Sequence, residues 1–226
     1  MGGERAAFFV VSTMVPGEGV ALFVVPEQTA GLKARSYFTH DGRGAADLQL
    51  DDVQLDAEAW LAGAPQAAIL LEQALQLGTL AQCAENVGAM RRALALTIDY
   101  LRTRQQFGKP LAAHQALQHR MVDHYGAWSS ARHLVRAAAN GWEHASSAER
   151  AERVSAARWM ADCAGRAIGL DMVQMHGAVG LQDETPISHY CKRLVMSQAL
   201  LGDASTHLGR FAAVQRERCA VKSATD

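Results

Sequence analysis

The sequence predicts a mainly α-helical protein, an antiparallel bundle of four long helices preceded by a partial β-domain of a few strands. Two observations carry this prediction. Residues 6–56 contain short β-branched and aromatic runs broken by turn residues, whereas from residue 63 onward apolar residues recur at steps of three and four. We therefore expect residues 1–62 to be the remnant of a β-domain, residues 63–216 to form the bundle, and residues 217–226 to be a flexible tail.

The expected β-domain begins with strands in residues 6–12 and 21–25, which are rich in β-branched and aromatic side chains. Gly17 and Gly19 between them, with the preceding proline, are typical of a hairpin turn. Residues 48–53 alternate well enough to form a further strand. Because three or four strands hardly bury a core alone, we expect them to be the end of a larger sheet or barrel.

The first expected helix covers residues 65–103, which hold no proline after Pro65. Such a helix would be about 60 Å long at 1.5 Å per residue. Its expected apolar stripe, interrupted by Arg91, consists of Leu77, Leu80, Ala84, Val87, Leu94, Ile98 and Leu101.

Three further helices complete the expected bundle. Pro110 is expected to open the second helix, which ends at Asn140 or near Ser146. The third helix is expected to run from Ser147 to a stop at Gly177, and its many alanines indicate close packing between helices. The fourth is expected to run from residue 186 to about residue 213, with a break at residue 202. The expected stripe of the third helix is Val154, Ala157, Ala161, Ala164, Ile168, Met172 and Met175.

Charge and composition exclude several classes of function. The net charge is -1, so nothing favours nucleic-acid or membrane-surface binding. No apolar run reaches the roughly 18 residues of a membrane span, and residues 1–5 do not read as the start of a secretory signal. The cysteines form no CxxC pair, so we expect no zinc site, no disulfide and a cytoplasmic location. They are Cys83, Cys163, Cys191 and Cys219.

Two motifs lie at the ends of the expected helices. The segment between the first two helices reads RQQFGKP from Arg104 and is followed by Gln115. The end of the third helix reads QMHGAVG from Gln174. In their order and spacing these motifs resemble those of the acyl-CoA dehydrogenase family over residues 64–216, and the strands before them resemble the last part of that family's middle β-domain.

The resemblance implies FAD held across a subunit interface. Arg104 would fork two hydrogen bonds to the pyrophosphate, and Gly177 would let backbone N–H groups approach the adenosine end. Phe107 would pack against the flavin or its ribityl arm, and Gln115 would supply an amide. Ala178 stands where the family usually has a second glycine, so that contact is expected to be weaker or shifted. The complete set of implied contacts is Arg104, Gln106, Phe107, Gln115, Gln174, Gly177 and Ala178.

Each of these residues also has a plain structural interpretation. Arg104 could complement the dipole at the C-terminus of its helix. Gly177 could simply end a helix, and Phe107 could fill a loop. The occurrence of both motifs in register favours the FAD interpretation.

The same resemblance implies a catalytic glutamate at one of two positions, and neither position holds one. Counting along the motifs, the commoner position falls on Leu201 and the other on Gly78. The α-proton of a thioester is weakly acidic, so its removal needs a carboxylate within hydrogen-bond reach. A shift of two residues would offer Asp203, whose simpler role is to cap a helix.

Other catalytic groups have weaker support. His176, His189 and His207 lie near the expected flavin face, but a lone histidine on a helix is usually structural or solvated. No Glu-x-x-His pair occurs, which argues against a di-iron carboxylate bundle. We expect no metal site.

The resemblance therefore implies an FAD-dependent oxidoreductase of lipid metabolism that introduces an α,β double bond into an acyl-CoA thioester. It would form a homo- or hetero-oligomer, a dimer or tetramer, and pass electrons to electron transfer flavoprotein. The family's first helical domain and most of its β-domain have no counterpart here, which suggests a fragment, a shortened product, or a partner chain that supplies the missing walls. The alternative is a non-catalytic subunit that completes the FAD site of a base-bearing partner, which Leu201 and Gly78 favour.

Overall fold

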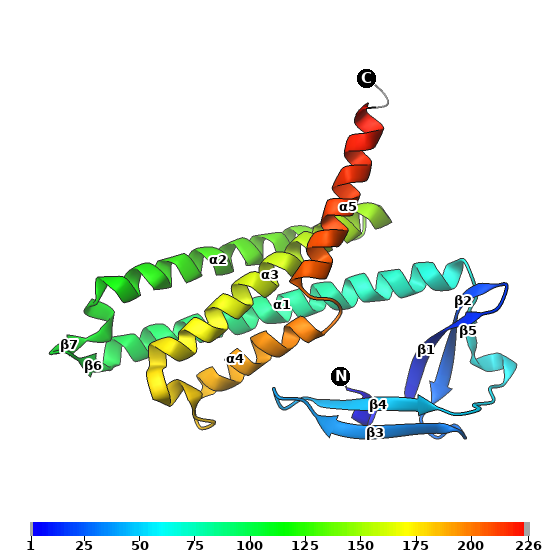
Figure 1. Cartoon of the computed structure of the whole chain (residues 1–226), viewed down its shortest axis with the longest axis horizontal. Helices are drawn as coiled ribbons and strands as arrows, with labels where there is room; N and C mark the ends of the chain where they lie inside the picture. Colours follow the sequence, from blue (N-terminus) through cyan, green and yellow to red (C-terminus); the bar gives the residue numbers. More distant parts are fainter. Residues whose placement is uncertain (1, 224–226) are drawn as a thin grey trace. The chain divides into compact units, whose positions relative to one another are not determined.

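The structure, a computed structural model, describes residues 2–223 (Figure 1). The chain divides into two compact units, Met1–Leu75 and Gln76–Asp226. The boundary falls inside the first long helix, α1 (Gln66–Thr103). Each unit has its own core, and the two are described separately below.

The first unit is built from antiparallel strands. One sheet has the order β1-β2-β5, and β3 pairs with β4 in a separate two-stranded ribbon. The expected hairpin is confirmed, because β1 pairs with β2 from Phe8 opposite Pro26 to Val15 opposite Gly19. The ribbon partner β3 was not expected. The strands are β1 (Phe8–Val15), β2 (Gly19–Pro26), β3 (Leu32–Phe38), β4 (Gly44–Leu50) and β5 (Trp60–Ala62).

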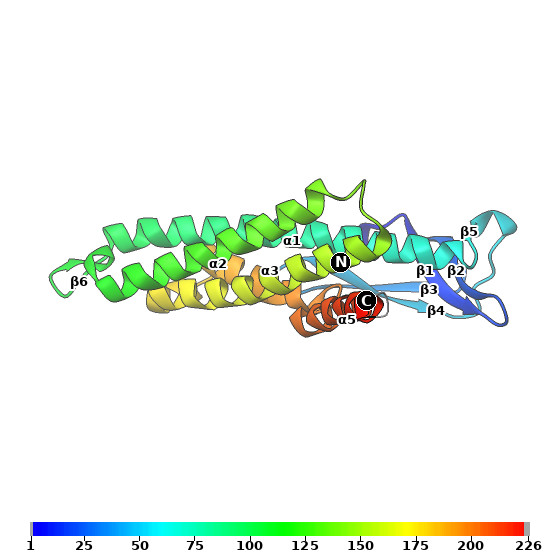
Figure 2. The ribbon, with the colours of Figure 1, turned by 90° about the horizontal axis from the view of Figure 1, so that it is seen from above.

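The second unit is helical, as expected, and Figure 2 shows α1, α2 and α3 running side by side. The expected break near Gly202 is confirmed, because α4 and α5 are separate helices. The expectation that Pro110 opens a helix is wrong: Pro110 ends a two-residue strand, and α2 begins five residues later. Beyond α1 the helices are α2 (Gln115–Asn140), α3 (Ser147–His176), α4 (Pro186–Met196) and α5 (Ala204–Ser223).

The C-terminal segment was expected to be a flexible tail from residue 217. In the structure α5 continues through this point to Ser223. The last part of the expected tail, residues 224–226, lies outside the described residues.

Local chemistry explains where α3 begins and ends. Ser146 and Glu149 form a capping box: the Ser146 hydroxyl accepts from the Glu149 amide at 3.3 Å, and the Glu149 carboxylate accepts from the Ser146 amide at 2.8 Å. At the other end Gly177 has φ 65°, a conformation that glycine adopts without a steric penalty. The helix therefore ends at His176, and Gly177 is its C-cap.

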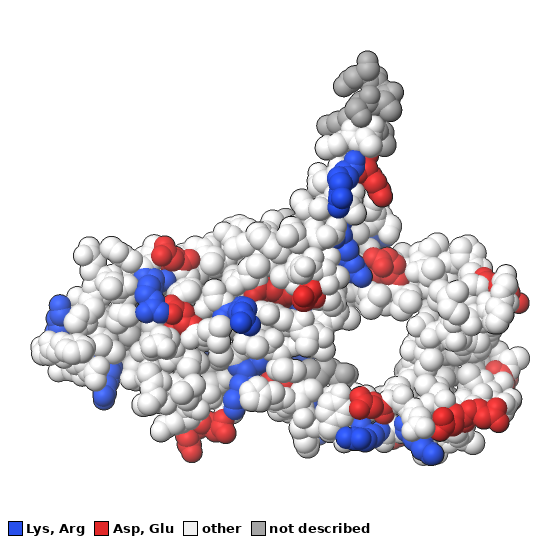
Figure 3. Space-filling view, in the orientation of Figure 1, with Lys and Arg blue, Asp and Glu red and all other residues white. Residues whose placement is uncertain are grey.

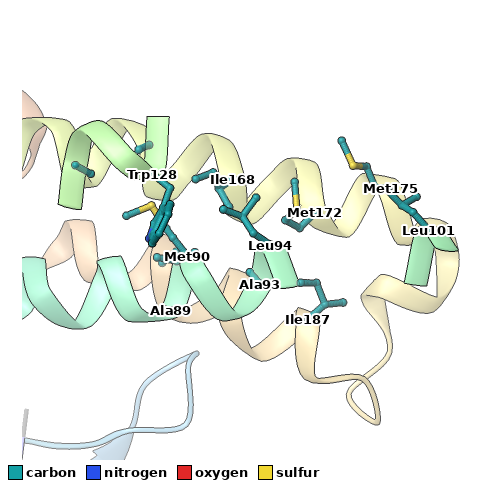
Figure 4. Packing of buried hydrophobic residues seen from close by; sticks show 13 residues of the cluster. Ala89, Met90, Ala93, Leu94, Leu101, Trp128, Ile168, Met172, Met175 and Ile187 are labelled. Carbon is teal, nitrogen blue, oxygen red and sulfur yellow. The ribbon is translucent and has the colours of Figure 1, made fainter. Parts of the chain in front are cut away.

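The bundle core contains side chains from four helices (Figure 4). All seven residues of the stripe expected on α3 are buried, which confirms that face. A Cβ built at Gly169 of α3 would lie 3.5 Å from the Cα of Cys191, so α3 and α4 pack closely. At this point a glycine, rather than one of the alanines, allows the close approach. The largest apolar cluster consists of Ala89, Met90, Ala93, Leu94, Leu101, Trp128, Ala131, Ala164, Ile168, Met172, Met175, Ile187 and Leu194.

The stripe expected on α1 is partly wrong. Leu77, Ala84 and Ile98 are exposed rather than buried. The buried face of α1 is displaced around the helix and carries several polar residues, so apolar periodicity selected a neighbouring face. The buried polar residues of α1 are Gln76, Thr79, Gln82, Asn86 and Thr97.

The charged side chains are dispersed. Figure 3 shows lysines and arginines mixed with aspartates and glutamates on the visible face. Within residues 2–223, none of the helices combines the length and hydropathy required for a bilayer span.

Candidate functional site

The two sequence motifs meet in one hollow at one end of the bundle. The hollow has a volume of about 410 Å³, within the usual range of ligand pockets. Arg104 and Gln106 line it from the segment after α1, and Gln174, Gly177 and Ala178 line it from the end of α3. Residues separated by about 70 positions in the chain are therefore neighbours in space, as the motifs predicted.

Arg104 is held by its backbone and leaves its side chain unengaged. Its amide donates to the carbonyl of Tyr100 at 2.8 Å, and its own carbonyl accepts from the amide of Leu111 at 2.8 Å. Within the described part of the chain, the exposed guanidinium makes no hydrogen bond or ion pair. An arginine whose backbone is held in place and whose guanidinium donors are unused is suited to bind a phosphate group at the rim of a hollow.

The glycine corner opposite Arg104 has two requirements for small residues. Gly177 needs its φ of 65° but has open space around a built Cβ. Gly180 has a packing requirement, because a Cβ there would lie 2.7 Å from the carbonyl oxygen of Val173. Ala178 lies in a short 3-10 helix without a positive φ, so its backbone does not need glycine. The substitution of alanine at this position is therefore compatible with the local conformation.

One wall of the hollow contains two aromatic side chains that the motifs did not single out as cofactor contacts. Tyr100 stacks on His176 with ring centroids 4.3 Å apart and an interplanar angle of 22°. The Tyr100 hydroxyl donates to the His176 carbonyl at 3.2 Å, and His176 Nδ1 lies 2.8 Å from the Met172 carbonyl. These contacts tie the end of α1 to the end of α3 and fix the two motifs relative to each other. The available sequence signal was the position of His176 within the second motif and of Tyr100 four residues before the first.

A partly buried charge cluster braces the adjacent wall. Asp171 of α3 accepts from Arg120 Nε at 3.1 Å, and its Oδ2 lies 2.6 Å from His124 Nε2. Burial lowers the pKa of His124, and the nearby Arg120 guanidinium lowers it further. Arg120 also lines the hollow but is paired with Asp171, whereas among the described residues no hydrogen bond or ion pair engages the guanidinium of Arg104.

Phe107 occupies the tip of a small hairpin. Strands β6 (Gln105–Gln106) and β7 (Lys109–Pro110) pair, and the two residues between them, Phe107 and Gly108, have φ of 56° and 75°. A hairpin with two positive-φ residues has the type I′ geometry, in which an aromatic residue is unusual. Phe107 is 87% exposed and packs edge-on to His114 at 5.9 Å between centroids.

Neither Phe107 nor Gln115 lines the hollow. Gln115 is the exposed first residue of α2. The structure thus brings together five of the seven expected cofactor contacts within one chain. The other two, Phe107 and Gln115, are exposed outside the hollow.

The two positions implied for a catalytic base also meet. A Cβ built at Gly78 would lie 3.3 Å from Leu201 Cδ1, although the residues are on α1 and on the turn between α4 and α5. No carboxylate is provided by either residue. Leu201 has φ 56°, followed by Gly202 with φ 89°. An apolar contact therefore occupies the point at which both counts placed the base.

Asp203 acts as a helix cap in this structure. Its Oδ1 accepts from the Thr206 amide at 2.8 Å and from the Thr206 hydroxyl at 2.6 Å, at the start of α5. These hydrogen bonds lower the pKa of Asp203, which makes it a weaker base. The geometry favours the capping role over a catalytic one.

The three histidines considered as catalytic groups each face a backbone carbonyl. His176 lies against Met172, and His189 Nε2 is 2.8 Å from the Asp183 carbonyl. His207 Nε2 is 2.9 Å from the Leu201 carbonyl. In such a contact the ring N–H donates a hydrogen bond to the carbonyl oxygen, which is a structural role.

Known proteins resemble the chain in both sequence and structure. Residues 68–215 match the family model for the C-terminal domain of acyl-CoA dehydrogenases. "Acyl-CoA dehydrogenase IpdE2" of Mycolicibacterium smegmatis is 38% identical over 135 residues, which are 59% of this chain and 41% of that protein. A chain of the ChsE4–ChsE5 complex from Mycobacterium tuberculosis superposes with a TM-score of 0.86 at 27% identity, covering 95% of this chain and 57% of that one.

A further solved structure, a "Tcur3481-Tcur3483 steroid ACAD" variant, superposes with a TM-score of 0.84 at 30% identity, covering 95% of this chain and 56% of that one. The chain thus spans about half the length of the relatives it matches.

Proposed function

The chain belongs to the acyl-CoA dehydrogenase family, and we propose that its bundle holds the pyrophosphate and adenosine part of FAD for the α,β-dehydrogenation of an acyl-CoA thioester. The observation that supports this function is the hollow in which Arg104 meets Gly177. The acyl-CoA substrate, the oligomeric assembly and electron transfer flavoprotein as acceptor are parts of the same proposal.

The residues of the hollow fit the phosphate-bearing part of such a cofactor. The unused donors of Arg104 suit pyrophosphate oxygens, and the amides of Gln106 and Gln174 suit polar atoms beside them. The open space at Gly177 allows close approach to the backbone. FAD, when bound, supplies the two-electron acceptor of the reaction.

Phe107 and Gln115 suit the part of a cofactor that lies outside this hollow. The exposed ring of Phe107 can cover an apolar ring system, and its strained backbone indicates that this position has a role beyond packing. We propose that both residues contact FAD bound mainly by a neighbouring subunit. The chain would then need a partner, identical or different, to complete each site.

A second candidate function is that of a subunit which completes the flavin site of a base-bearing partner. The contact between Leu201 and Gly78 favours it, because neither residue can accept a proton. Asp203 is poorly suited to replace the missing glutamate as base, because it caps α5 and its pKa is lowered. One of the similar structures is described as a complex of two named chains, ChsE4 and ChsE5, which is a precedent for an assembly of two different chains.

Flavin absorbance separates the two candidates. The 226-residue chain is purified with and without a co-expressed acyl-CoA dehydrogenase chain that carries the glutamate, and straight-chain and ring-bearing acyl-CoA substrates are added in turn. Yellow protein that bleaches on its own supports the dehydrogenase. Protein that becomes yellow and bleaches only with the partner supports the completing subunit, and colourless protein in both arms contradicts both functions.

A further inference from the structure

The turn between α4 and α5 is strained at a bulky residue. Leu201 and Gly202 are consecutive residues in the left-handed region, with φ of 56° and 89°. Leucine is disfavoured there because its Cβ approaches the neighbouring carbonyl. Such a conformation persists only where surrounding contacts hold it in place.

Arg158 of α3 supplies the first of these contacts. Its Nη2 donates to the carbonyls of Ser197 at 2.5 Å and Leu200 at 2.9 Å. Its Nε lies 3.0 Å from Oδ2 of Asp162, one helical turn along α3. Arg158 is 0% exposed. A charge is rarely buried so completely, and here its hydrogen bonds are directed at a single turn.

His207 of α5 supplies the second contact. Its Nε2 donates to the carbonyl of Leu201 at 2.9 Å, and its Nδ1 lies 3.3 Å from the hydroxyl of Ser155. His207 is 1% exposed. A Cβ at Gly202 would lie 3.1 Å from His207 Nε2, so the glycine also allows this histidine to approach the turn.

Together these contacts fix the direction of one side chain. The carbonyls of Leu200 and Leu201 are each held by a buried side chain from a helix, and Asn86 of α1 donates to the Ser197 hydroxyl at 2.9 Å. With the backbone fixed on both sides, the side chain at position 201 is directed at Gly78. The buried polar groups hold the turn, and the turn holds Leu201.

We propose that Arg158 and His207 are positioning residues that lock the turn before α5 and hold Leu201 against Gly78, so that this apolar contact faces the acyl group at the position that the family resemblance gives to the catalytic base. This inference rests on the proposed function for the identity of the ligand. The lock itself rests only on the contacts within the bundle. Its two parts are therefore tested separately.

The lock is tested by amide hydrogen exchange on the full chain. His207→Leu removes the donor to Leu201, whereas His207→Gln keeps an amide N–H that can reach the same carbonyl. We expect exchange in residues 198–203 to accelerate at least tenfold in His207→Leu and less than threefold in His207→Gln, with the core of α3 unchanged. Arg158→Lys is a second variant of the lock, while Arg158→Ala is avoided here because it removes the partner of buried Asp162. Equal exchange in wild type and His207→Leu would overturn the lock.

The direction of position 201 is tested by installing a carboxylate there. In the assembly that binds FAD, Leu201→Glu would restore a carboxylate that could take the α-proton of the acyl group, while FAD would supply the acceptor for the β-hydride and its electron pair, so that the α and β carbons would become a double bond. We expect Leu201→Glu to raise the rate of bleaching by acyl-CoA at least tenfold. Adding His207→Leu should remove most of this gain through kcat, and adding His207→Gln should retain it.

The control for the second test is His189→Leu, which removes another carbonyl-bound histidine that does not contact the turn. Combined with Leu201→Glu, it should leave the gained rate unchanged. If Leu201→Glu binds FAD without a gain in rate, or if His207→Leu leaves the gain intact, the proposed direction of residue 201 is overturned. If no assembly binds FAD, the proposed function fails instead, and the exchange experiment still decides the lock.

Discussion

Two arginines of the same bundle occupy opposite environments. Arg104 is exposed at the rim of a hollow and makes no hydrogen bond or ion pair with its side chain among the described residues. Arg158 is fully buried, faces Asp162 and donates to the carbonyls of Ser197 and Leu200. The first has unused donors available to a ligand, and the second uses donors to hold the fold.

This difference separates the residue proposed to bind the ligand, Arg104, from the residue proposed to position the turn before α5, Arg158. An exposed, ligand-binding arginine can be removed with little effect on folding, because its side chain is solvated and its loss leaves no buried group without a partner. A buried arginine cannot, because its removal takes away the partner of the buried Asp162 carboxylate and the donor to the Leu200 carbonyl. The following predictions test this distinction, in order of expected effect.

The largest effect is expected for Arg158→Ala. The substitution leaves Asp162 buried without its partner, so the free energy of unfolding should fall by about 3–5 kcal/mol. Urea unfolding followed by circular dichroism measures this change. A loss below about 1 kcal/mol would contradict the role given to Arg158.

Arg104→Ala should show the reverse pattern. The free energy of unfolding should change by less than about 0.5 kcal/mol, since the side chain is exposed. The binding free energy of FAD should weaken by about 1.5–3 kcal/mol, roughly tenfold to 150-fold in affinity, because a charge-assisted contact to pyrophosphate is lost. Arg102→Ala is the matched control on the same helix end. If both variants weaken FAD equally, the contact assigned to Arg104 is wrong.

A smaller effect is expected from pH at His207. Burial lowers the pKa of His207, and the nearby Arg210 and Arg158 lower it further. The hydrogen bond to the Leu201 carbonyl and the charge of Asp203 raise the pKa and offset part of this shift. At and below its ordinary pKa of 6.5, His207 therefore binds a proton more readily in the unfolded chain than in the native chain. Its contribution to stability is fully present above pH 6.5 and is lost as the pH falls through the lowered native pKa.

Urea unfolding between pH 7 and pH 5 checks this dependence. Wild type should lose more stability over this range than His207→Gln, which has no group to protonate. His189 is exposed, so His189→Gln serves as a control, and its loss of stability between pH 7 and pH 5 should equal that of wild type. Parallel curves for wild type and His207→Gln would show that the histidine does not titrate with folding.

The smallest effect is expected for Ala178→Gly. Because Ala178 has no positive φ, glycine offers no conformational advantage there. FAD affinity should change by less than about twofold, or about 0.4 kcal/mol. A gain of tenfold, measured by flavin titration, would instead show that the alanine methyl group weakens the cofactor contact.

The sequence predicted the helices well where their buried face is apolar. The stripe from Val154 to Met175 is buried throughout. On α1 the buried face includes Gln76 and Asn86, so apolar spacing identified a face on which Leu77 is exposed. The short hairpin at Phe107 was missed because aromatic residues seldom occupy a type I′ turn.

For the site, the sequence predicted which segments meet but not what holds them. Spacing brought Arg104 and Gly177 together correctly, since helix lengths determine where each motif ends. Arg158 was missed because a charged residue on a helix normally faces solvent. His207 was noted, but its contact with Leu201 depends on the break between α4 and α5, which fixes the direction of α5.

The approach of Gly78 to Leu201 also limits how this pair can change over evolution. A built Cβ at residue 78 would already be 3.3 Å from the leucine methyl group, so two large side chains cannot occupy these positions together. Replacement of one by a long residue requires the other to remain small. In an alignment of proteins that share this turn, the side-chain volumes at the two positions should therefore be anticorrelated.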